Sequence, residues 1–260
     1  MSLALSMVLL RECVAVPAAR VEQELRARYP DLSATNPEDD KDIATVKLRD
    51  GELFVAPMPA PIPWSDLEGP CATSLLWKNA ADEVKPHCAH LIVSLLTELS
   101  EVERQIVLTK VTVAVLAASD AAIGVYWGSA SLLVPKDFFL EYAAEILPLG
   151  PPLDVWVDFR VGWQTDTTSA GFTKGMEALG HMELEARDWP EEPSELRDRF
   201  RELARYLVEN GPVIRDGDTI GQDATEKVRA VYAPSTFGQN TRVMQLHYLS
   251  SPAKPWWKIW

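Results

Sequence analysis

Hydrophobic residues in this chain fall into short β-prone runs and helix-spaced stripes. Residues 4–10 and 90–96 are continuous apolar runs, typical of strands buried on both faces. Residues 16–29 carry apolar positions four apart among charges, which predicts a helix. Residues 101–119 predict a helix whose apolar positions reach almost all round the axis from Ile106 to Ala118, so we expect this helix to lie centrally, packed on a sheet.

Turn residues divide the first half further. Residues 43–48 and 52–55 flank Asp50-Gly51, which predicts a β-hairpin. The polar, acidic residues 32–41 predict a loop, and a helix is expected over residues 73–83. Alternating prolines in residues 56–64 forbid a central strand and favour an extended connector that positions Trp64, with docking to a proline-recognising partner as the alternative.

The rest of the chain continues this mixture of elements. Strands are expected at residues 122–127, 153–163, 227–232 and 241–249, and a helix at residues 135–147. A further helix follows Asp188, capped by Asp188 with Glu191 or by Ser194, and Asn210-Gly211-Pro212 ends it. Its buried stripe is predicted to be Leu196, Phe200, Leu203 and Leu207.

Pairs of strands after single helices predict an α+β fold with mixed, mainly antiparallel sheets and packed helices. The segment Pro-Leu-Gly-Pro-Pro at residues 148–152 can continue neither helix nor sheet. It divides an N-terminal α+β half, residues 1–150, from a C-terminal α+β half, residues 151–260, and both are expected to pack as one compact unit. The order of elements is loosely similar in the two halves, which leaves an internal duplication open.

Composition narrows the class of protein. With 47% hydrophobic and 24% charged residues, the 260-residue chain has the composition of an ordinary globular protein. A net charge of -13 argues against binding to nucleic acid or to an anionic membrane, and it suits a basic protein partner or cations. The alternative is an acidic protein whose charge implies no partner.

The cysteines and the N-terminus indicate a cytoplasmic protein. Cys13, Cys71 and Cys88 show no metal-binding or disulfide spacing, so we expect reduced thiols. The apolar start lacks a basic region and meets Arg11 too early for a signal peptide, and no apolar run approaches the roughly 20 residues that span a bilayer.

A charged strand face is the first candidate site. Residues 181–187 alternate perfectly, so the polar side chains share one face: His181, Glu183, Glu185 and Arg187. The opposite, core-facing side carries Met182, Leu184 and Ala186. Paired carboxylates beside a histidine could perform acid–base work or hold a cation, or they could form ion pairs with Arg160 or Lys174 on a neighbouring strand.

Three further groups offer weaker chemistry. Asp216-Gly217-Asp218 is typical of a turn that caps itself through its aspartates, with a weak calcium or magnesium site near Glu183 as the alternative. His87 and His90 stand at a strand entrance, where they point to opposite faces, so hydrogen-bonded histidines are favoured over a metal site. The end of the chain carries Trp256 and Trp257, which either fold back on the core or contact a partner. The chain shows no common enzyme signature, and we expect no catalytic residue, metal or cofactor.

Six short segments carry a resemblance to a known family: MVLLRE, PIPWSDLE, HCAHLIVSL, GVYWGSAS, LGHMELEA and DGDTIG. In these segments the chain resembles the bacterial domain of unknown function 4261 (DUF4261) family. The family has no agreed activity, so no catalytic residue can be carried over. Families of this kind recur near polymorphic toxins and type VI secretion loci, and the resemblance therefore implies an immunity protein.

These observations predict a non-enzymatic binding protein, an immunity protein that neutralises a cognate basic, nuclease-type toxin by occluding its active site. The expected partner-binding residues are His181, Glu183, Glu185, Asp216, Asp218, Trp256 and Trp257. One alternative is a metal-dependent hydrolase that uses His181, Glu183, Glu185 and Asp218. Another is an accessory or adaptor protein of a secretion system, with the Trp-rich end or the proline segment as its contact.

Overall fold

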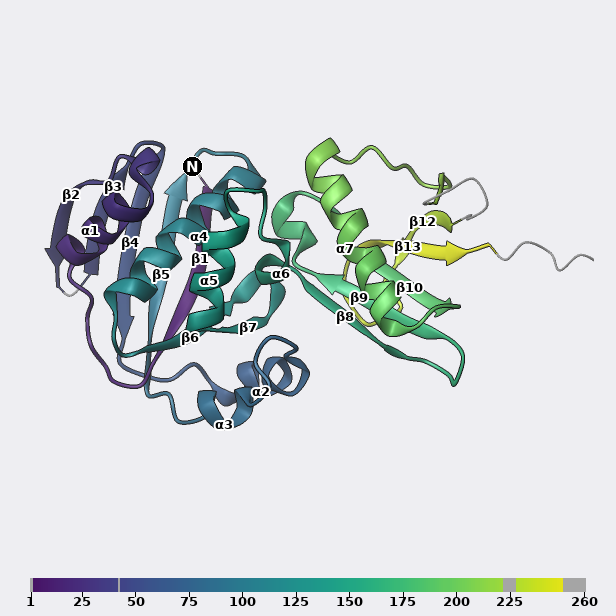
Figure 1. Ribbon diagram of the computed structural model, residues 1–260, viewed down its shortest axis with the longest axis horizontal. Coiled ribbons are helices and arrows are strands. Elements are labelled where there is room, and N and C mark those ends of the chain that lie inside the picture. Colours follow the sequence, from purple (N-terminus) through teal and green to yellow (C-terminus); the bar gives the residue numbers. More distant parts are fainter. Residues whose placement is uncertain (1, 42, 222–227, 250–260) are drawn as a thin grey trace, which may run out of the picture. The chain divides into compact units, whose positions relative to one another are not determined.

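The chain divides into two compact units, Met1–Asp158 and Phe159–Trp260, in a computed structural model that describes residues 2–41, 43–221 and 228–249 (Figure 1). Each unit contains a mainly antiparallel sheet with helices packed on it, so the fold is α+β, as the element order predicts. The division falls after Asp158, whereas the proline-rich segment that the sequence offers as a boundary ends at Pro152.

The first unit is built on a seven-stranded sheet of order β2-β3-β4-β5-β1-β6-β7. Each neighbouring pair in this sheet is antiparallel. Its strands are β1 (Ser2–Leu10), β2 (Thr35–Asp40), β3 (Ile43–Leu48), β4 (Gly51–Met58), β5 (Ala89–Thr97), β6 (Ala122–Trp127) and β7 (Leu132–Pro135). Its helices are α1 (Ala18–Arg28), η1 (Pro30–Leu32), α2 (Trp64–Thr73), α3 (Ala80–Val84), α4 (Glu101–Ala118), η2 (Gly128–Ala130), α5 (Lys136–Ile146) and α6 (Leu153–Trp156).

Helices α1, α4 and α5 cover one face of this sheet (Figure 1). The side chains of β1 that point to this face, from Ala4 to Leu10 at every second position, are buried, and the Ser6 hydroxyl lies 2.8 Å from that of Thr112 on α4. Helix α4 starts at a capping box, in which the Ser100 N–H donates to the Glu103 carboxylate at 3.2 Å. The nearly all-round apolar surface of α4 from Ile106 onward is thus explained by its position between the sheet and its two helical neighbours.

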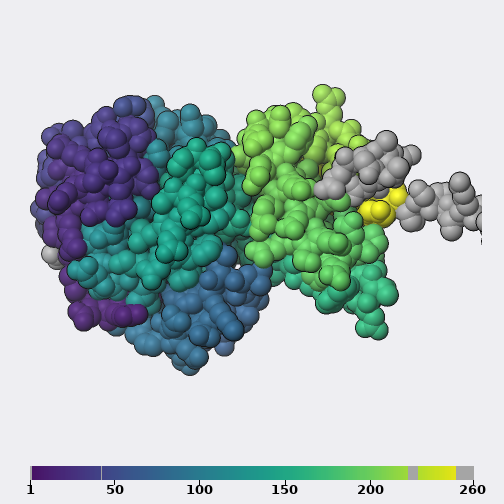
Figure 2. All heavy atoms as spheres, viewed as in Figure 1, coloured from purple at the N-terminus to yellow at the C-terminus, as the bar shows by residue number. Residues whose placement is uncertain are grey.

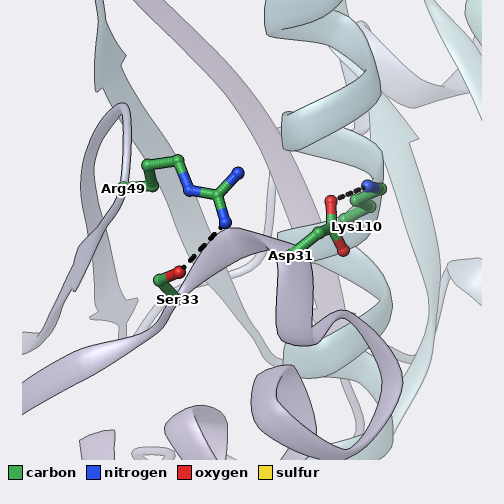
Figure 3. A network of polar contacts seen from close by, with 4 residues as sticks. All are labelled: Asp31, Ser33, Arg49 and Lys110. Carbon is green, nitrogen blue, oxygen red and sulfur yellow. Dashed lines mark hydrogen bonds and ion pairs between the residues drawn. The ribbon is translucent and has the colours of Figure 1, made fainter.

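A polar network ties the chain between α1 and β2 to the rest of the first unit (Figure 3). Lys110 Nζ of α4 lies 2.5 Å from Asp31 Oδ2, and Arg49 Nη2 donates to Ser33 Oγ at 3.3 Å. The Arg49 N–H also donates to the Leu32 carbonyl at 2.8 Å. Exposed pairs of this kind contribute less than about 1 kcal/mol each, so the network positions the edge of the sheet more than it stabilises it.

The second unit has a six-stranded sheet of order β11-β12-β13-β10-β9-β8. Its strands are β8 (Asp158–Trp163), β9 (Ser169–Lys174), β10 (Leu184–Trp189), β11 (Thr219–Ile220), β12 (Val228–Pro234) and β13 (Arg242–Tyr248), and its helices are η3 (Met176–Leu179) and α7 (Pro193–Asn210). Strands β10 and β13 are parallel. The strand order differs from that of the first sheet, so the loose similarity of the two halves does not extend to sheet topology.

Helix α7 packs on the second sheet through the stripe that the sequence predicts, since Leu196, Phe200, Leu203 and Leu207 are all buried. The predicted caps are wrong: Glu192 is the N-cap, and its N–H donates to the Glu195 carboxylate at 3.2 Å. The predicted end at Gly211 is confirmed by its positive φ of 78° and by its N–H, which donates to the Leu207 carbonyl at 2.8 Å.

Three further predictions need correction. Residues 35–40, expected as a loop, form the edge strand β2, which tolerates Pro37 and exposed acids because only β3 pairs with it. The helix expected over residues 73–83 is instead the pair α2 and α3. Residues 153–156, expected as the start of a strand, form the turn α6, in which Trp156 donates to the Thr109 hydroxyl at 2.7 Å.

One of the alternating prolines lies in an inner strand, which the sequence pattern did not predict. Pro57 lies within β4, although β4 is an inner strand of the sheet. The pairing of β4 with β3 ends at Val55, so Pro57 has a ladder neighbour on the β5 side, Leu91. Pro57 is therefore at a local edge, where a missing N–H is tolerated.

Candidate functional site

Glu183 and Glu185, predicted to share the charged face of a strand over residues 181–187, are both buried, and the observed strand β10 begins only at Leu184. Glu183 is 3% exposed and Glu185 is 1% exposed. Glu183 precedes the strand and Glu185 lies on it, and loops of the second unit cover both carboxylates. Their hydrogen bonds show what each carboxylate does.

Glu183 holds the start of the short helix η3. Its Oε1 accepts the N–H groups of Gly175 at 2.7 Å and Glu177 at 3.2 Å, and its Oε2 accepts the Thr173 hydroxyl at 2.7 Å. Burial raises the pKa of Glu183, and the hydrogen bonds from Thr173 and from the main chain of residues 175–177 act in the opposite direction. This carboxylate is an internal cap for main-chain donors.

Glu185 anchors the turn between β12 and β13. It accepts the Ser235 hydroxyl, the Thr236 N–H at 2.9 Å and the Thr236 hydroxyl at 3.0 Å. Arg187 holds the same turn from outside: its Nε donates to the Thr236 hydroxyl and its Nη2 to the Thr236 carbonyl, both at 2.8 Å. The Arg187 guanidinium also lies 4.1 Å from the centre of the Phe237 ring. Glu183, Glu185 and Arg187 therefore hold loops of the second unit in place.

The Asp216-Gly217-Asp218 segment is the self-capped turn that the sequence predicts. Asp218 Oδ2 accepts the Arg215 N–H at 2.7 Å, and Gly217 has a positive φ of 86°. Asp216 Oδ1 accepts the Tyr232 N–H at 2.8 Å, which fixes the turn to β12.

No three of the residues named for the hydrolase, His181, Glu183, Glu185 and Asp218, gather as metal ligands in the described part of the chain. Asp216 contacts Tyr232 of β12, Tyr232 is paired with Met244 of β13, and the Met244 N–H donates to the Glu183 carbonyl at 2.8 Å. Two strand spacings, roughly 10 Å, thus separate the aspartate turn from the Glu183 main chain. His181 is half-buried, and burial lowers its pKa.

His87, just before β5, and His90, within β5, are hydrogen-bonded to the main chain, as the sequence predicts. His87 Nε2 accepts the Ile62 N–H at 2.9 Å, so the proton resides on Nδ1, which lies 2.6 Å from the Val84 carbonyl. His90 Nδ1 lies 2.8 Å from the Ala60 carbonyl. Burial is the main cause of a lowered pKa at His87. No three His, Cys, Asp or Glu side chains gather as metal ligands anywhere in the described residues.

A cavity of about 450 Å³ lies within the second unit, between α7 and strands β11–β13. Its apolar lining is Trp189, Leu203, Ile214, Ile220, Val228 and Leu246. The polar lining includes Arg199, Glu202 and Tyr206, and no serine, cysteine or histidine belongs to the described lining. Sequence patterns did not indicate this cavity, because its walls come from elements far apart along the chain.

The negative charge belongs almost entirely to the first unit, which runs from purple to teal in Figure 2. This unit has 23 acidic and 12 basic residues, a net charge of -11, whereas the second unit has 15 and 13, a net charge of -2. Many of the acids are exposed, among them Asp137, Glu141 and Glu145 at four-residue spacing on α5. The excess of acidic residues is therefore in the first unit, whereas the predicted partner-binding acids are in the second.

Trp256 and Trp257 lie outside the described residues. Within residues 2–41, 43–221 and 228–249, no helix is both long and apolar enough to cross a membrane.

The geometry defines a two-unit α+β protein with an acidic first unit and a second unit held together by buried carboxylates. A family model described as "Domain of unknown function (DUF4261)" matches residues 172–247, in the second unit. The match includes LGHMELEA and DGDTIG and supports the resemblance to this family, and the other four resembling segments lie outside it. Comparisons with curated proteins and with solved structures gave no match.

Proposed function

We propose that this chain is a binding protein that neutralises a basic protein toxin in the cytoplasm, as an immunity protein does. The observation that carries the proposal is the concentration of charge: a net -11 on the first unit alone. Such a surface steers a basic partner into contact and occupies a cleft that otherwise binds phosphate groups.

The carboxylates of the second unit bear on the hydrolase alternative. Glu183, Glu185, Asp216 and Asp218 all accept main-chain N–H groups of their own unit. Side chains used in this way are structural, so they give no support to the metal-dependent hydrolase. The adaptor hypothesis depends on the Trp-rich end, which lies outside the described residues.

The test is capture of the partner followed by an assay of its toxicity. The full chain, carrying an affinity tag, is purified from its native cells, and proteins bound in a 1:1 ratio are identified by mass spectrometry. We expect a protein with clustered Lys and Arg that stops growth when it is expressed alone in a heterologous bacterium. Co-expression of this chain should restore growth.

Two outcomes contradict the proposal. Either no basic protein is retained at stoichiometric level, or the retained protein does not inhibit growth. Because purification at about 0.1 M salt preserves electrostatic contacts and about 1 M salt screens them, both conditions belong in the experiment.

A further inference from the structure

One face of the seven-stranded sheet is only partly covered. Strands alternate their side chains between the two faces, and the even-numbered side of β1 lies under α4. On the odd-numbered side, Leu3 is 60% exposed and Leu5 is 38% exposed. Both are on an inner strand of the sheet, where an exposed leucine pair is unusual.

The strand register shows that these leucines belong to an apolar surface that Ser94 interrupts. Leu3 is opposite Leu96, and Met7 is opposite Ile92, both on β5. On β4, Phe54 is opposite Ser94 of β5, which in turn is opposite Leu5. We call this surface the open face; its apolar members are Leu3, Leu5, Met7, Ile43, Phe54, Ile92 and Leu96, each half-buried or exposed. It crosses four strands, β3-β4-β5-β1, over roughly 15 Å.

Helices α2 and α3 cover one end of this side of the sheet. Leu9 of β1 and Leu133 of β7 form a buried cluster with Leu67 of α2 and Val84 of α3. Trp77 lies over Gly124 in the same region, where an added Cβ would come within 2.5 Å of the indole ring. The cover ends there, because Met7 is packed against this cluster while Leu5, two residues earlier, is exposed.

The open face differs in chemistry from an ordinary solvated face. Antiparallel sheets with one face in water carry polar side chains on that face. In the rows of β1 and β5 from Leu3 to Met7 the side chains are instead Leu, Ile and Met, with Ser94 as the polar member, and apolar patches of this kind mark interaction surfaces.

Acidic residues at the border of the open face indicate a partner with basic residues around its contact surface. On its β2–β4 side, Glu38 is opposite Thr45, Asp40 is opposite Ile43, and Glu52 is opposite Leu96, so all three carboxylates belong to this face. Lys47 on β3 is opposite Glu52 and belongs to the same face, so it is the basic residue beside these three carboxylates. A second copy of the chain is disfavoured as the occupant, because each first unit carries a net charge of -11.

We propose that the open face binds a protein partner through an apolar patch that is bordered by Lys and Arg. This inference deepens the proposed function, on which it rests for the identity of the partner. Leu5 and Ile92 lie at the apolar centre, and Glu38, Asp40 and Glu52 provide the charged rim. This is the usual division of an interface into an apolar core and a polar rim.

The first experiment places a photo-crosslinking amino acid, benzoylphenylalanine, at Leu5 of the full chain in its native cells. The matched control carries it at Leu149, which is also a leucine of the first unit and is 82% exposed, on the loop after α5. We expect a basic protein, identified by mass spectrometry, to be crosslinked from position 5 and not from position 149. Absence of a basic protein at position 5, or equal crosslinking from both positions, overturns the proposal.

The second experiment measures affinity for the crosslinked protein by titration calorimetry. Leu5→Lys should weaken binding at least about 30-fold, since interface centres carry most of the binding energy. Leu149→Lys, the same chemical change elsewhere, should change it less than 2-fold, about 0.4 kcal/mol or smaller. Asp40→Lys should weaken binding more than Glu141→Lys. Glu141 is the control because it lies on α5, which covers the opposite face of the sheet. Circular dichroism of each variant confirms that it is folded.

The outcomes separate the two proposals. If Leu5→Lys binds as tightly as the wild type, the open face is refuted, whether or not the partner is a toxin. If the partner crosslinks at position 5 and does not inhibit growth, the immunity function fails and the surface stands. If the free chain is a dimer that Leu5→Lys makes monomeric, the occupant is a second copy and the proposal is overturned.

Discussion

Replacement of Glu183 tests whether the acidic strand face is structural. Glu183→Ala removes the acceptor of three donors: the Thr173 hydroxyl and the N–H groups of Gly175 and Glu177. A buried donor left without a partner destabilises a protein by about 1–3 kcal/mol. With three donors, and with water able to reach some of them after truncation, we expect a loss of about 3 kcal/mol or more.

Two measurements are suited to this prediction. Urea denaturation reports the loss of free energy of unfolding for the chain as a whole. Amide hydrogen exchange at Gly175 and Glu177 reports the local effect, and exchange should accelerate by about two orders of magnitude, since 1.4 kcal/mol corresponds to a factor of ten. Glu183→Gln is the control, because its amide oxygen can still accept both main-chain N–H groups.

The pH dependence gives an independent check. Burial raises the pKa of Glu183 above its ordinary value of 4.5, so the folded state binds its proton more tightly than the unfolded state. The contribution of Glu183 to stability is therefore greatest below pH 4.5 and declines as the pH rises through the folded-state pKa. Wild type should lose stability relative to Glu183→Gln over this range. A structural role is refuted if Glu183→Ala unfolds within about 0.5 kcal/mol of the wild type, which is the effect of an ordinary surface change.

Three further substitutions test other parts of the structure. Glu185→Ala should release the turn at Ser235 and Thr236 and lower the free energy of unfolding by about 2 kcal/mol. Amide hydrogen exchange at Thr236 should become faster, and unchanged exchange would contradict the anchor role. Burial lowers the pKa of His87 below 6.5, so its contribution to stability is present above pH 6.5 and is lost as the pH falls. His87→Gln should therefore reduce the pH dependence of the urea midpoint measured between pH ~5 and ~8. Gly124→Ala should destabilise the first unit by about 2 kcal/mol or more, because the new Cβ would meet the Trp77 ring at 2.5 Å and the Val134 carbonyl at 2.6 Å. Its control, Gly69→Ala in α2, meets nothing within 4 Å and should be neutral or stabilising by about 0.5–1 kcal/mol in the same thermal unfolding assay.

Local patterns predicted most of the regular elements because those elements follow from their own side chains. The apolar runs gave β1 and β5, the Asp50-Gly51 turn gave the hairpin of β3 and β4, and the stripe of α7 is buried as expected. Where prediction failed, a neighbour decided the outcome. Strand β2 exists because β3 pairs with it, and residues 153–156 turn into α6 because the core receives both Val155 and Trp156.

The candidate site shows the same division. The strand predicted over residues 181–187 is observed as β10 from Leu184 to Trp189, so Glu185 lies on it and Glu183 precedes it. Whether these carboxylates face water depends on loops that come from residues 175–177 and 235–236. Short sequence patterns cannot specify such contacts, so a charged face that looked like a docking surface is an internal set of caps.

The sequence by itself determined the α+β class, the acidic character and the positions of the strongest helices and strands, since these depend on composition and on the spacing of neighbouring side chains. Only the tertiary structure decided which acids are available to a partner and which sheet face stays open. Both depend on how distant segments cover one another: loops bury Glu183 and Glu185, while α2 and α3 stop short of Leu3 and Leu5. The surface proposed for recognition lies where that cover ends.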